Sequence, residues 1–363
     1  MITDALLGPI VRRVKSHSDT SRDSTRSFLS KHLSTIGKVN RFLFRGYSPF
    51  EPLALQIETT INCNLRCQHC ERTYWPSNHY VDMSFDQFRS IIDQFHYLSV
   101  LSLTGIGEGL LNKDIIQMIR YAKSKNIFVS MTTNGTLLNP LINHDIISSG
   151  LDELSFSIES ADPETYGKIR VGADFNRVIG NIKRFVYMKD NLGSNIPEVV
   201  LRTVAMKHTI HEIPGLLKLA HDISVKHLMV CPLIYSFKDG LEQPNPEEMK
   251  DVYEKSKELA KQLSVNLDWD LVNRGKFTSY KCMVPYYNPY IFREGYVAPC
   301  CLVTQRLARD DVIENFTFGN VLEEKYSKIQ NNEKFKSFRR KLLSSDPEEI
   351  PDICKDCWML FRG

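Results

Sequence analysis

The chain has 363 residues, more than one compact domain usually contains, and its hydrophobic and charged fractions of 42% and 25% are those of an ordinary globular protein. The formal net charge of +3 gives no strong attraction to nucleic acid, so we expect no nucleic-acid partner. No stretch approaches the roughly 18 apolar residues of a membrane span. An apolar run near the amino terminus precedes the basic residues, the reverse of a secretory signal, so we expect a cytoplasmic protein.

Residues 1–50 form a basic extension in which apolar residues recur at roughly helical spacing. One interpretation is an amphipathic helix that packs on the main domain. The other is a docking segment for a substrate carrier, an acidic partner or a membrane surface.

Between residues 51 and 240, short β-branched strands alternate with helices. This alternation predicts an α/β fold of parallel β/α units with right-handed crossovers, about six of them in an open or partial barrel. Active sites on such sheets lie at the carboxyl ends of the strands. The predicted strands are 53–58, 100–103, 128–132, 153–158, 199–204 and 227–230. The predicted helices are one that begins with a capping box at 84–87 and others at 113–125, 139–149, 175–188 and 213–222.

Two further regions complete the predicted domain organisation. Residues 241–275 are expected to be a helical connection, with a helix from Pro246 to about Leu263. Residues 276–363 are rich in aromatics, cysteines and short turns, and predict a second, smaller domain. Within it, 290–293 and 296–299 flank Glu294-Gly295 and predict a β-hairpin.

Three of the nine cysteines, Cys63, Cys67 and Cys70, directly follow the first predicted strand. In a chain whose thiols stay reduced, such close spacing indicates a metal site rather than disulfides. Three thiolates can hold a [4Fe–4S] cluster and leave its fourth iron open to a ligand. Structural zinc is the alternative, with His69 as fourth ligand, although His69 directly precedes Cys70, which is an awkward spacing for two ligands of one ion.

The Cys-x-x-x-Cys-x-x-Cys arrangement after a first strand resembles the signature of the radical S-adenosylmethionine (SAM) superfamily. By this resemblance the three cysteines hold the cluster, and the amino and carboxylate groups of SAM bind the open iron. An electron from the cluster then cleaves SAM to methionine and a 5′-deoxyadenosyl radical. An aromatic residue commonly precedes the last cysteine and lies near the adenine, and His69 occupies that place.

Two glycine-containing segments at strand ends continue the resemblance. Thr104-Gly-Ile-Gly-Glu108 is similar to the Gly-Gly-Glu motif, which implies that Gly107 and Glu108 bind the SAM ammonium group; Gly109 stands where a proline usually follows. Asn134, in Thr-Thr-Asn-Gly, is similar to the family's segment near the SAM ribose.

The fourth predicted strand resembles the family's Ser-Ile-Asp strand and the arginine after it. The resemblance implies that Ser157 and Arg170 hold the SAM carboxylate, which suits the guanidinium fork. Glu159 replaces the more usual aspartate. The likeness runs in order from about residue 53 to residue 232, so chance explains it poorly.

A second set of cysteines lies in the predicted C-terminal domain: Cys282, Cys300, Cys354 and Cys357. The hairpin would bring the first two together, and the Cys-x-x-Cys loop would close a four-thiolate site that also suits zinc by spacing alone. The pattern resembles the auxiliary-cluster domain of SPASM and twitch radical SAM enzymes. Because the sequence ends at Gly363 without the further cysteines of a full SPASM domain, the resemblance implies one auxiliary [4Fe–4S] cluster.

Two other cysteines have less definite roles. Cys301 is an alternative ligand to Cys300 or a spare thiol. Cys231, at the end of the sixth predicted strand, is interpreted as a core residue.

Together these features predict a radical SAM oxidoreductase-type enzyme that takes a hydrogen atom from a small-molecule or carrier-bound substrate, with a donor such as flavodoxin or ferredoxin. The second cluster could accept an electron from the substrate radical, bind substrate or relay electrons. Peptide modification is the alternative within the superfamily, although the extension is short for a leader-peptide domain. Alternatives from other classes are a zinc-stabilised RNA- or protein-binding protein, and an electron carrier, which would leave Glu108, Asn134 and Arg170 without a purpose.

Overall fold

The computed structural model describes residues 46–74, 80–233, 240–269, 282–305, 307–344, 346–355 and 357. The helix predicted within the basic extension lies outside these residues. None of the described helices is both long enough and apolar enough to cross a membrane.

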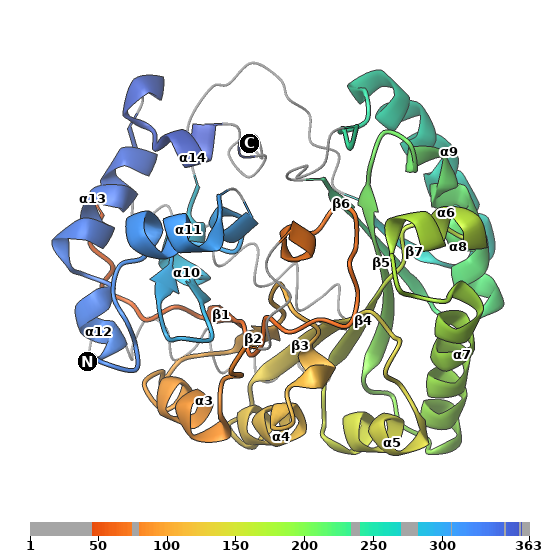
Figure 1. Cartoon of the computed structure of the whole chain (residues 1–363), viewed down its shortest axis with the longest axis horizontal. Helices are drawn as coiled ribbons and strands as arrows, with labels where there is room; N and C mark the ends of the chain where they lie inside the picture. The colour runs from red at the N-terminus through yellow and green to blue at the C-terminus, as the bar shows by residue number, and fades with distance from the viewer. Residues whose placement is uncertain are drawn as a thin grey trace.

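In the described residues, nine strands form one curved sheet, in the order β7-β6-β5-β4-β3-β2-β1-β8-β9 (Figure 1). Every neighbouring pair from β7 to β8 is parallel, and only β8 and β9 pair antiparallel. The strands are β1 Ala54–Ile57, β2 Val100–Leu103, β3 Phe128–Thr133, β4 Glu153–Ser157, β5 Glu198–Ala205, β6 His227–Pro232, β7 Asn266–Trp269, β8 Tyr290–Ile291 and β9 Val297–Ala298. The predicted α/β fold, a partial barrel with a small C-terminal domain, is confirmed.

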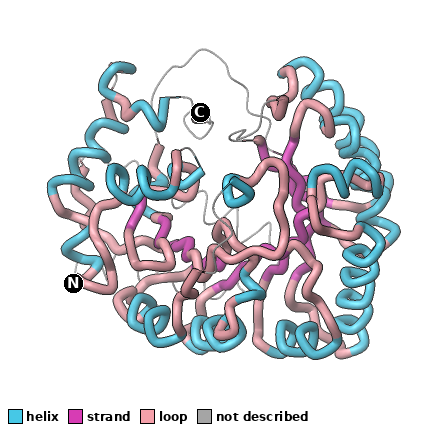
Figure 2. Tube along the Cα trace, viewed as in Figure 1, coloured by secondary structure: helices cyan, strands magenta, loops and turns pink. Residues whose placement is uncertain are grey.

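The helices of the β/α units cover the convex face of the sheet, and the concave face is left toward the centre of the molecule (Figure 2). The predicted capping box is present, because Ser84 Oγ accepts from Gln87 N and Gln87 Oε1 accepts from Ser84 N. The helices are α3 Phe85–Ile92, α4 Ile115–Ser124, α5 Pro140–Ser148, α6 Pro163–Ile169, α7 Phe175–Asn191, α8 Ile213–Asp222 and α9 Pro246–Leu263.

Side chains alternate between the two faces of the sheet. On β5, Val199, Leu201 and Ala205 belong to the apolar core beneath the helices, which puts Arg202 on the concave face. The same alternation gives this face a polar character on other strands, where the register partners Gln56, Ser102 and Ser130 face it. The concave face, which lines the lumen of the partial barrel, therefore carries both polar residues and apolar ones such as Phe128 and Met229.

The segment after residue 240 differs in part from the prediction. The helix from Pro246 to Leu263 is present as α9, but β7 follows it and extends the sheet, which the sequence analysis did not predict. The residues of β7, Asn-Leu-Asp-Trp, include no β-branched residue, and Asn and Asp are depleted in strands, so the sequence gives little strand signal there. The domain boundaries proposed from the sequence remain predictions.

The C-terminal part is attached to the barrel through the sheet itself. The predicted hairpin is present but short, and β8 pairs in parallel with β1, with Gln56 beside Tyr290 and Ile57 beside Ile291. Around it lie α10 Val284–Tyr287, α11 Arg309–Phe316, α12 Tyr326–Ile329, α13 Glu333–Leu342 and α14 Asp352–Lys355.

Candidate active site

The first three cysteines lie on one loop between the carboxyl end of β1 and the short helix η1, Glu71–Tyr74. Cys67 is buried, and Cys63 and Cys70 are partly buried. Backbone hydrogen bonds from Arg66 N to Val171 O and from Gln68 N to Ile169 O, both 2.9 Å, hold the loop against the end of α6. The loop is thus fixed at the mouth of the lumen.

The donor set at this loop fits an iron–sulfur cluster. Burial raises the pKa of Cys67 to about 11 and that of Cys70 to about 12, so the thiols are protonated without a metal and would lose protons on binding one. Arg170 Nη1 lies 3.8 Å from Cys67 Sγ and brings a positive charge to a thiolate there. These three thiols would supply three ligands and leave one iron open.

Glu108 and its glycine stand on the next loop, after β2. Glu108 is buried, and its carboxylate accepts hydrogen bonds from Thr133 Oγ1 at 2.8 Å and Asn134 N at 2.7 Å. A Cβ at Gly107 would lie 2.5 Å from Thr60 O, so the close approach of the two loops requires glycine. Burial raises the pKa of Glu108, against the opposing effect of the Asn134 amide.

Asn134 connects this loop to the cysteine loop. Its Nδ2 donates to Asn64 Oδ1 at 2.9 Å, and its Oδ1 accepts from Thr136 Oγ1 at 2.7 Å. Asn64 also donates to Thr136 Oγ1, at 2.7 Å. Thr133 belongs to the Thr-Thr-Asn-Gly segment identified in the sequence, whereas the sequence analysis gave no role to Asn64 and Thr136; their signal was their position within two residues of Cys63 and Asn134.

Arg170, Glu159 and His69 form the opposite side of the site. Arg170 donates to both oxygens of Glu159, and its Nη2 lies 2.7 Å from Oε1. Burial alone would raise the pKa of Glu159, but Arg170 outweighs it and lowers that pKa. His69 Nε2 is 3.8 Å from Glu159 Oε1. Ser157, at the end of β4, is partly buried and pairs in register with Arg202.

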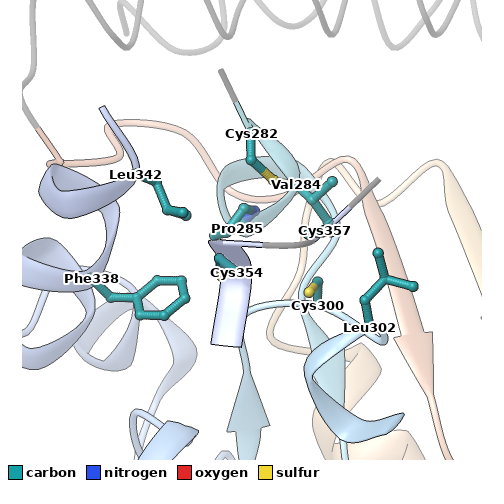
Figure 3. Close-up of a pocket in the computed structure, with 9 residues that line it drawn as sticks. All are labelled: Cys282, Val284, Pro285, Cys300, Leu302, Phe338, Leu342, Cys354 and Cys357. Atoms are coloured by element: carbon teal, nitrogen blue, oxygen red, sulfur yellow. The ribbon is translucent and has the colours of Figure 1, made fainter. Parts of the chain in front are cut away.

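The four C-terminal cysteines identified in the sequence share one cavity, where Figure 3 shows them between the α13 side chains Phe338 and Leu342 and the side chain of Leu302. Cys301 is not among the residues that line the cavity. Burial raises the pKa of the Cys282 thiol to about 12. The lining residues are Cys282, Val284, Pro285, Cys300, Leu302, Phe338, Leu342, Cys354 and Cys357.

Neither group of thiols is arranged around a single point. Among the described residues, no three His, Cys, Asp or Glu side chains converge as ligands of one metal ion. A zinc ion or an iron–sulfur cluster would draw its thiolates together on binding.

A buried polar network joins the loop after β1 to the C-terminal part of the chain. Glu58, after β1, accepts hydrogen bonds from Tyr290 Oη at 2.8 Å and Arg309 Nη2 at 2.7 Å, and Arg309 also pairs with Glu294 at 2.6 Å. Glu71 lies near them: burial first, and then the charge of Glu58, raise its pKa to about 8. The sequence analysis missed this network, because its members are distant in sequence.

The fold and site define a partial β/α barrel protein with an iron–sulfur donor set at the lumen mouth and a second thiol-lined cavity beside it. Residues 57–220 match the family model described as the radical SAM superfamily, and residues 282–358 match the SPASM model, described as an iron–sulfur cluster-binding domain. The chain therefore belongs to the radical SAM superfamily and carries a C-terminal SPASM-type domain. The first domain binds a [4Fe–4S] cluster and SAM, and the second binds auxiliary iron–sulfur.

Among curated proteins, the chain is 26% identical over 312 residues to the tungsten-containing aldehyde ferredoxin oxidoreductase cofactor-modifying protein of Pyrococcus furiosus, covering 78% of this chain and 82% of that one. It is also 26% identical over 291 residues to a probable GTP 3′,8-cyclase of Methanocaldococcus jannaschii, which covers 74% of this chain and 91% of that one.

Among solved structures, Streptococcus suis SuiB bound to precursor peptide SuiA has a TM-score of 0.68 at 17% identity and covers 94% of this chain and 76% of that one. The anSMEcpe structure with bound AdoMet has a TM-score of 0.61 at 16% identity and covers 86% of this chain and 85% of that one. At this level of identity the likeness concerns the fold alone.

Proposed function

We propose that this radical SAM enzyme abstracts a hydrogen atom from a substrate held in the lumen of the partial barrel. The observation that carries the proposal is the group of three cysteines on one loop, with Glu108 and Asn134 on one side and Arg170 on the other. When bound, the cluster supplies the electron that cleaves SAM to the 5′-deoxyadenosyl radical.

The chain's own residues would position the cosubstrate. Cys63, Cys67 and Cys70 would hold three irons. Glu108, fixed by Thr133 and Asn134, offers a buried carboxylate to the SAM ammonium group. By the family resemblance, Gly107 lets the backbone approach, Asn134 lies near the ribose, His69 near the adenine, and Ser157 and Arg170 at the carboxylate. Holding the reactive carbon close to one C–H bond, away from water, is the main contribution of the protein.

For the second domain we propose one auxiliary [4Fe–4S] cluster on Cys282, Cys300, Cys354 and Cys357. Their common cavity supports this ligand set, and Cys300 is favoured over Cys301 because Cys300 lines the cavity. Such a cluster would accept an electron from the substrate radical, which would make the net reaction a two-electron oxidation. A flavodoxin or ferredoxin in the cytoplasm is the proposed electron donor.

A small-molecule or carrier-bound substrate is the first candidate, since the names of the curated relatives refer to a cofactor-modifying protein and to a nucleotide cyclase. A peptide is the second candidate, favoured by the likeness to SuiB with its precursor peptide.

The test is anaerobic reconstitution with iron and sulfide, followed by dithionite and SAM. We expect about eight irons per chain, from two four-iron clusters, and formation of 5′-deoxyadenosine. The matched control replaces Cys63, Cys67 and Cys70 by alanine, which should leave about four irons and no 5′-deoxyadenosine. A fully metallated wild-type protein that binds no SAM would contradict the proposal.

A further inference from the structure

Arg339, on α13, is a fully buried cation, with an exposed fraction of 0%. Its guanidinium donates to backbone carbonyl oxygens, namely Pro285 O at 3.0 Å, Gln330 O at 2.5 Å and Gly46 O at 3.4 Å. The guanidinium carbon also lies 3.8 Å from the centre of the Phe335 ring. Because arginine stays protonated in proteins, a positive charge is fixed in the interior of the C-terminal part.

The other buried arginines are paired with carboxylates, and Arg339 is not. Arg170 pairs with Glu159, and Arg309 pairs with Glu58. In the part of the chain that the structure describes, Arg339 forms no ion pair. Burial lowers its pKa, and the groups that oppose this effect are tyrosine hydroxyls rather than carboxylates. Carbonyl dipoles and ring faces stabilise a cation but do not cancel its net charge, and a buried charge without a counter-charge is costly.

The guanidinium lies close behind the wall of the auxiliary cavity. Phe338, the residue before Arg339, lines this cavity, and so does Pro285 (Figure 3). The carbonyl oxygen of Pro285 accepts from both Nε and Nη2 of Arg339, at 3.2 Å and 3.0 Å. A helix with its side chains is about 10–12 Å across, so the charge and the thiols are separated by roughly that width.

The wall of the cavity screens this charge only weakly. Apart from the cysteines, every residue that lines the cavity is apolar: Val284, Pro285, Leu302, Phe338 and Leu342. Charges interact more strongly across such an apolar medium than across water. A [4Fe–4S] cluster held by four thiolates is an anion, and its reduction adds another negative charge. A nearby cation therefore stabilises the reduced cluster more than the oxidised one.

We infer that Arg339 is the counter-charge of the auxiliary cluster and raises its reduction potential. This inference rests on the proposed auxiliary cluster, and it adds the residue that makes this cluster a better acceptor for an electron from the substrate radical. Arg339 does not itself line the cavity, so it acts through the potential of the cluster and is not a catalytic residue.

The test measures the midpoint potential of the auxiliary cluster. The parent protein is the full chain with Cys63, Cys67 and Cys70 replaced by alanine, so that only this cluster contributes a signal. It is reconstituted with iron and sulfide, and a reductive titration is followed by electron paramagnetic resonance. Arg339→Met removes the charge and keeps a long side chain, and we expect a more negative midpoint. At the midpoint of the parent, the ratio of reduced to oxidised cluster should fall about tenfold, as for one charge about 12 Å away at an effective dielectric constant of about 20.

Two variants of the same helix are the controls. Arg340→Gln removes the next cation of α13, whose side chain is 52% exposed and lies 3.6 Å from Glu333. Water and salt screen this charge, so the midpoint should not move. Arg339→Lys keeps a positive charge and should keep a midpoint closer to that of the parent than to that of Arg339→Met.

A second variant changes the charge without removing Arg339. Gln330 is buried, and its Oε1 has no hydrogen-bond partner. Gln330→Glu preserves the shape of the side chain and adds a carboxylate on the residue whose carbonyl oxygen accepts from Arg339 Nη1. The added carboxylate would compensate the cation, so we expect the midpoint to become more negative, as in Arg339→Met.

Midpoints equal to that of the parent in both Arg339→Met and Gln330→Glu would overturn the inference. A lysine variant shifted as far as the methionine variant would also overturn it, since the shift would then follow from lost packing and not from lost charge. If Arg339→Met does not fold, Gln330→Glu decides alone. A parent without bound iron would overturn the inference together with the proposed auxiliary cluster, and iron analysis distinguishes this outcome from an unchanged midpoint.

Discussion

The guanidinium of Arg170 is held by the carboxylate of Glu159 through two hydrogen bonds, and its remaining Nη1 lies 3.8 Å from Cys67 Sγ. Both side chains are almost fully buried, at 8% and 1% exposure. Glu159 thereby fixes a cation beside one of the thiols expected to hold the cluster. Because two of the donor atoms of Arg170 are taken by Glu159, only part of the guanidinium is left for the SAM carboxylate.

Replacing Glu159 by glutamine should destabilise the protein by about 3 kcal/mol or more, because it leaves Arg170 as an uncompensated buried charge. Thermal or denaturant unfolding of the reconstituted protein measures the change in the free energy of unfolding. The control is Glu164→Gln, which breaks the exposed Lys168–Glu164 pair of α6 and should have no measurable effect. Equal stability of the two variants would show that the buried pair is not what holds Arg170.

Replacing Gly107 by alanine should distort the contact between the two loops of the SAM site. The new Cβ would lie 2.5 Å from Thr60 O and 2.7 Å from Asn62 O, which are backbone atoms that cannot rotate away. We expect a loss of about 1–3 kcal/mol of stability and weaker SAM binding, measured by unfolding and equilibrium dialysis. Gly167→Ala, on α6 with no atom within 4 Å of the added carbon, should instead be neutral or stabilising.

The barrel could be predicted from sequence because its pattern is local. β-Branched runs such as 199–204 alternate with helices that carry their own start signals, as at Ser84. The pairing of β8 with β1 could not be predicted, because β8 has only two residues and its partner is distant in the sequence. The strand β7 could not be predicted because Asn-Leu-Asp-Trp contains no β-branched residue.

In the site, too, local motifs could be predicted from the sequence and contacts between distant segments could not. The first three cysteines, Glu108 and Asn134 stand in short motifs at strand ends, and Arg170 caps the helix α6 that follows β4. The structure brings Glu108 to Asn134 and Arg170 to Cys67. The network of Glu58, Tyr290 and Arg309 spans more than 230 residues, and nothing in the local sequence of any member indicates its partners. The orientation of Arg170 toward Glu159 likewise depends on the packing of α6 against the sheet.

The choice between Cys300 and Cys301 as ligand can be tested by counting iron. Cys300 lines the cavity shared with Cys282, Cys354 and Cys357, so Cys300→Ala should lose the auxiliary cluster and fall from about eight irons per chain to about four. Cys301→Ala should keep about eight. Iron analysis and the electron paramagnetic resonance spectrum of the reduced protein give the answer, and the reverse pattern would make Cys301 the ligand.

Replacing Tyr290 by phenylalanine should weaken the junction between the barrel and the C-terminal domain. Tyr290 Oη donates to Glu58 Oε2 at 2.8 Å in a fully buried site, and Glu58 would keep Arg309 as its partner but lose one donor. The expected loss is about 1–3 kcal/mol in the free energy of unfolding, measured with denaturant. Tyr187→Phe, on α7 with the side chain 69% exposed, removes the same hydroxyl group without a buried partner and should leave stability unchanged. Should the two variants unfold alike, the hydrogen bond between Tyr290 and Glu58 contributes nothing to holding the domains together.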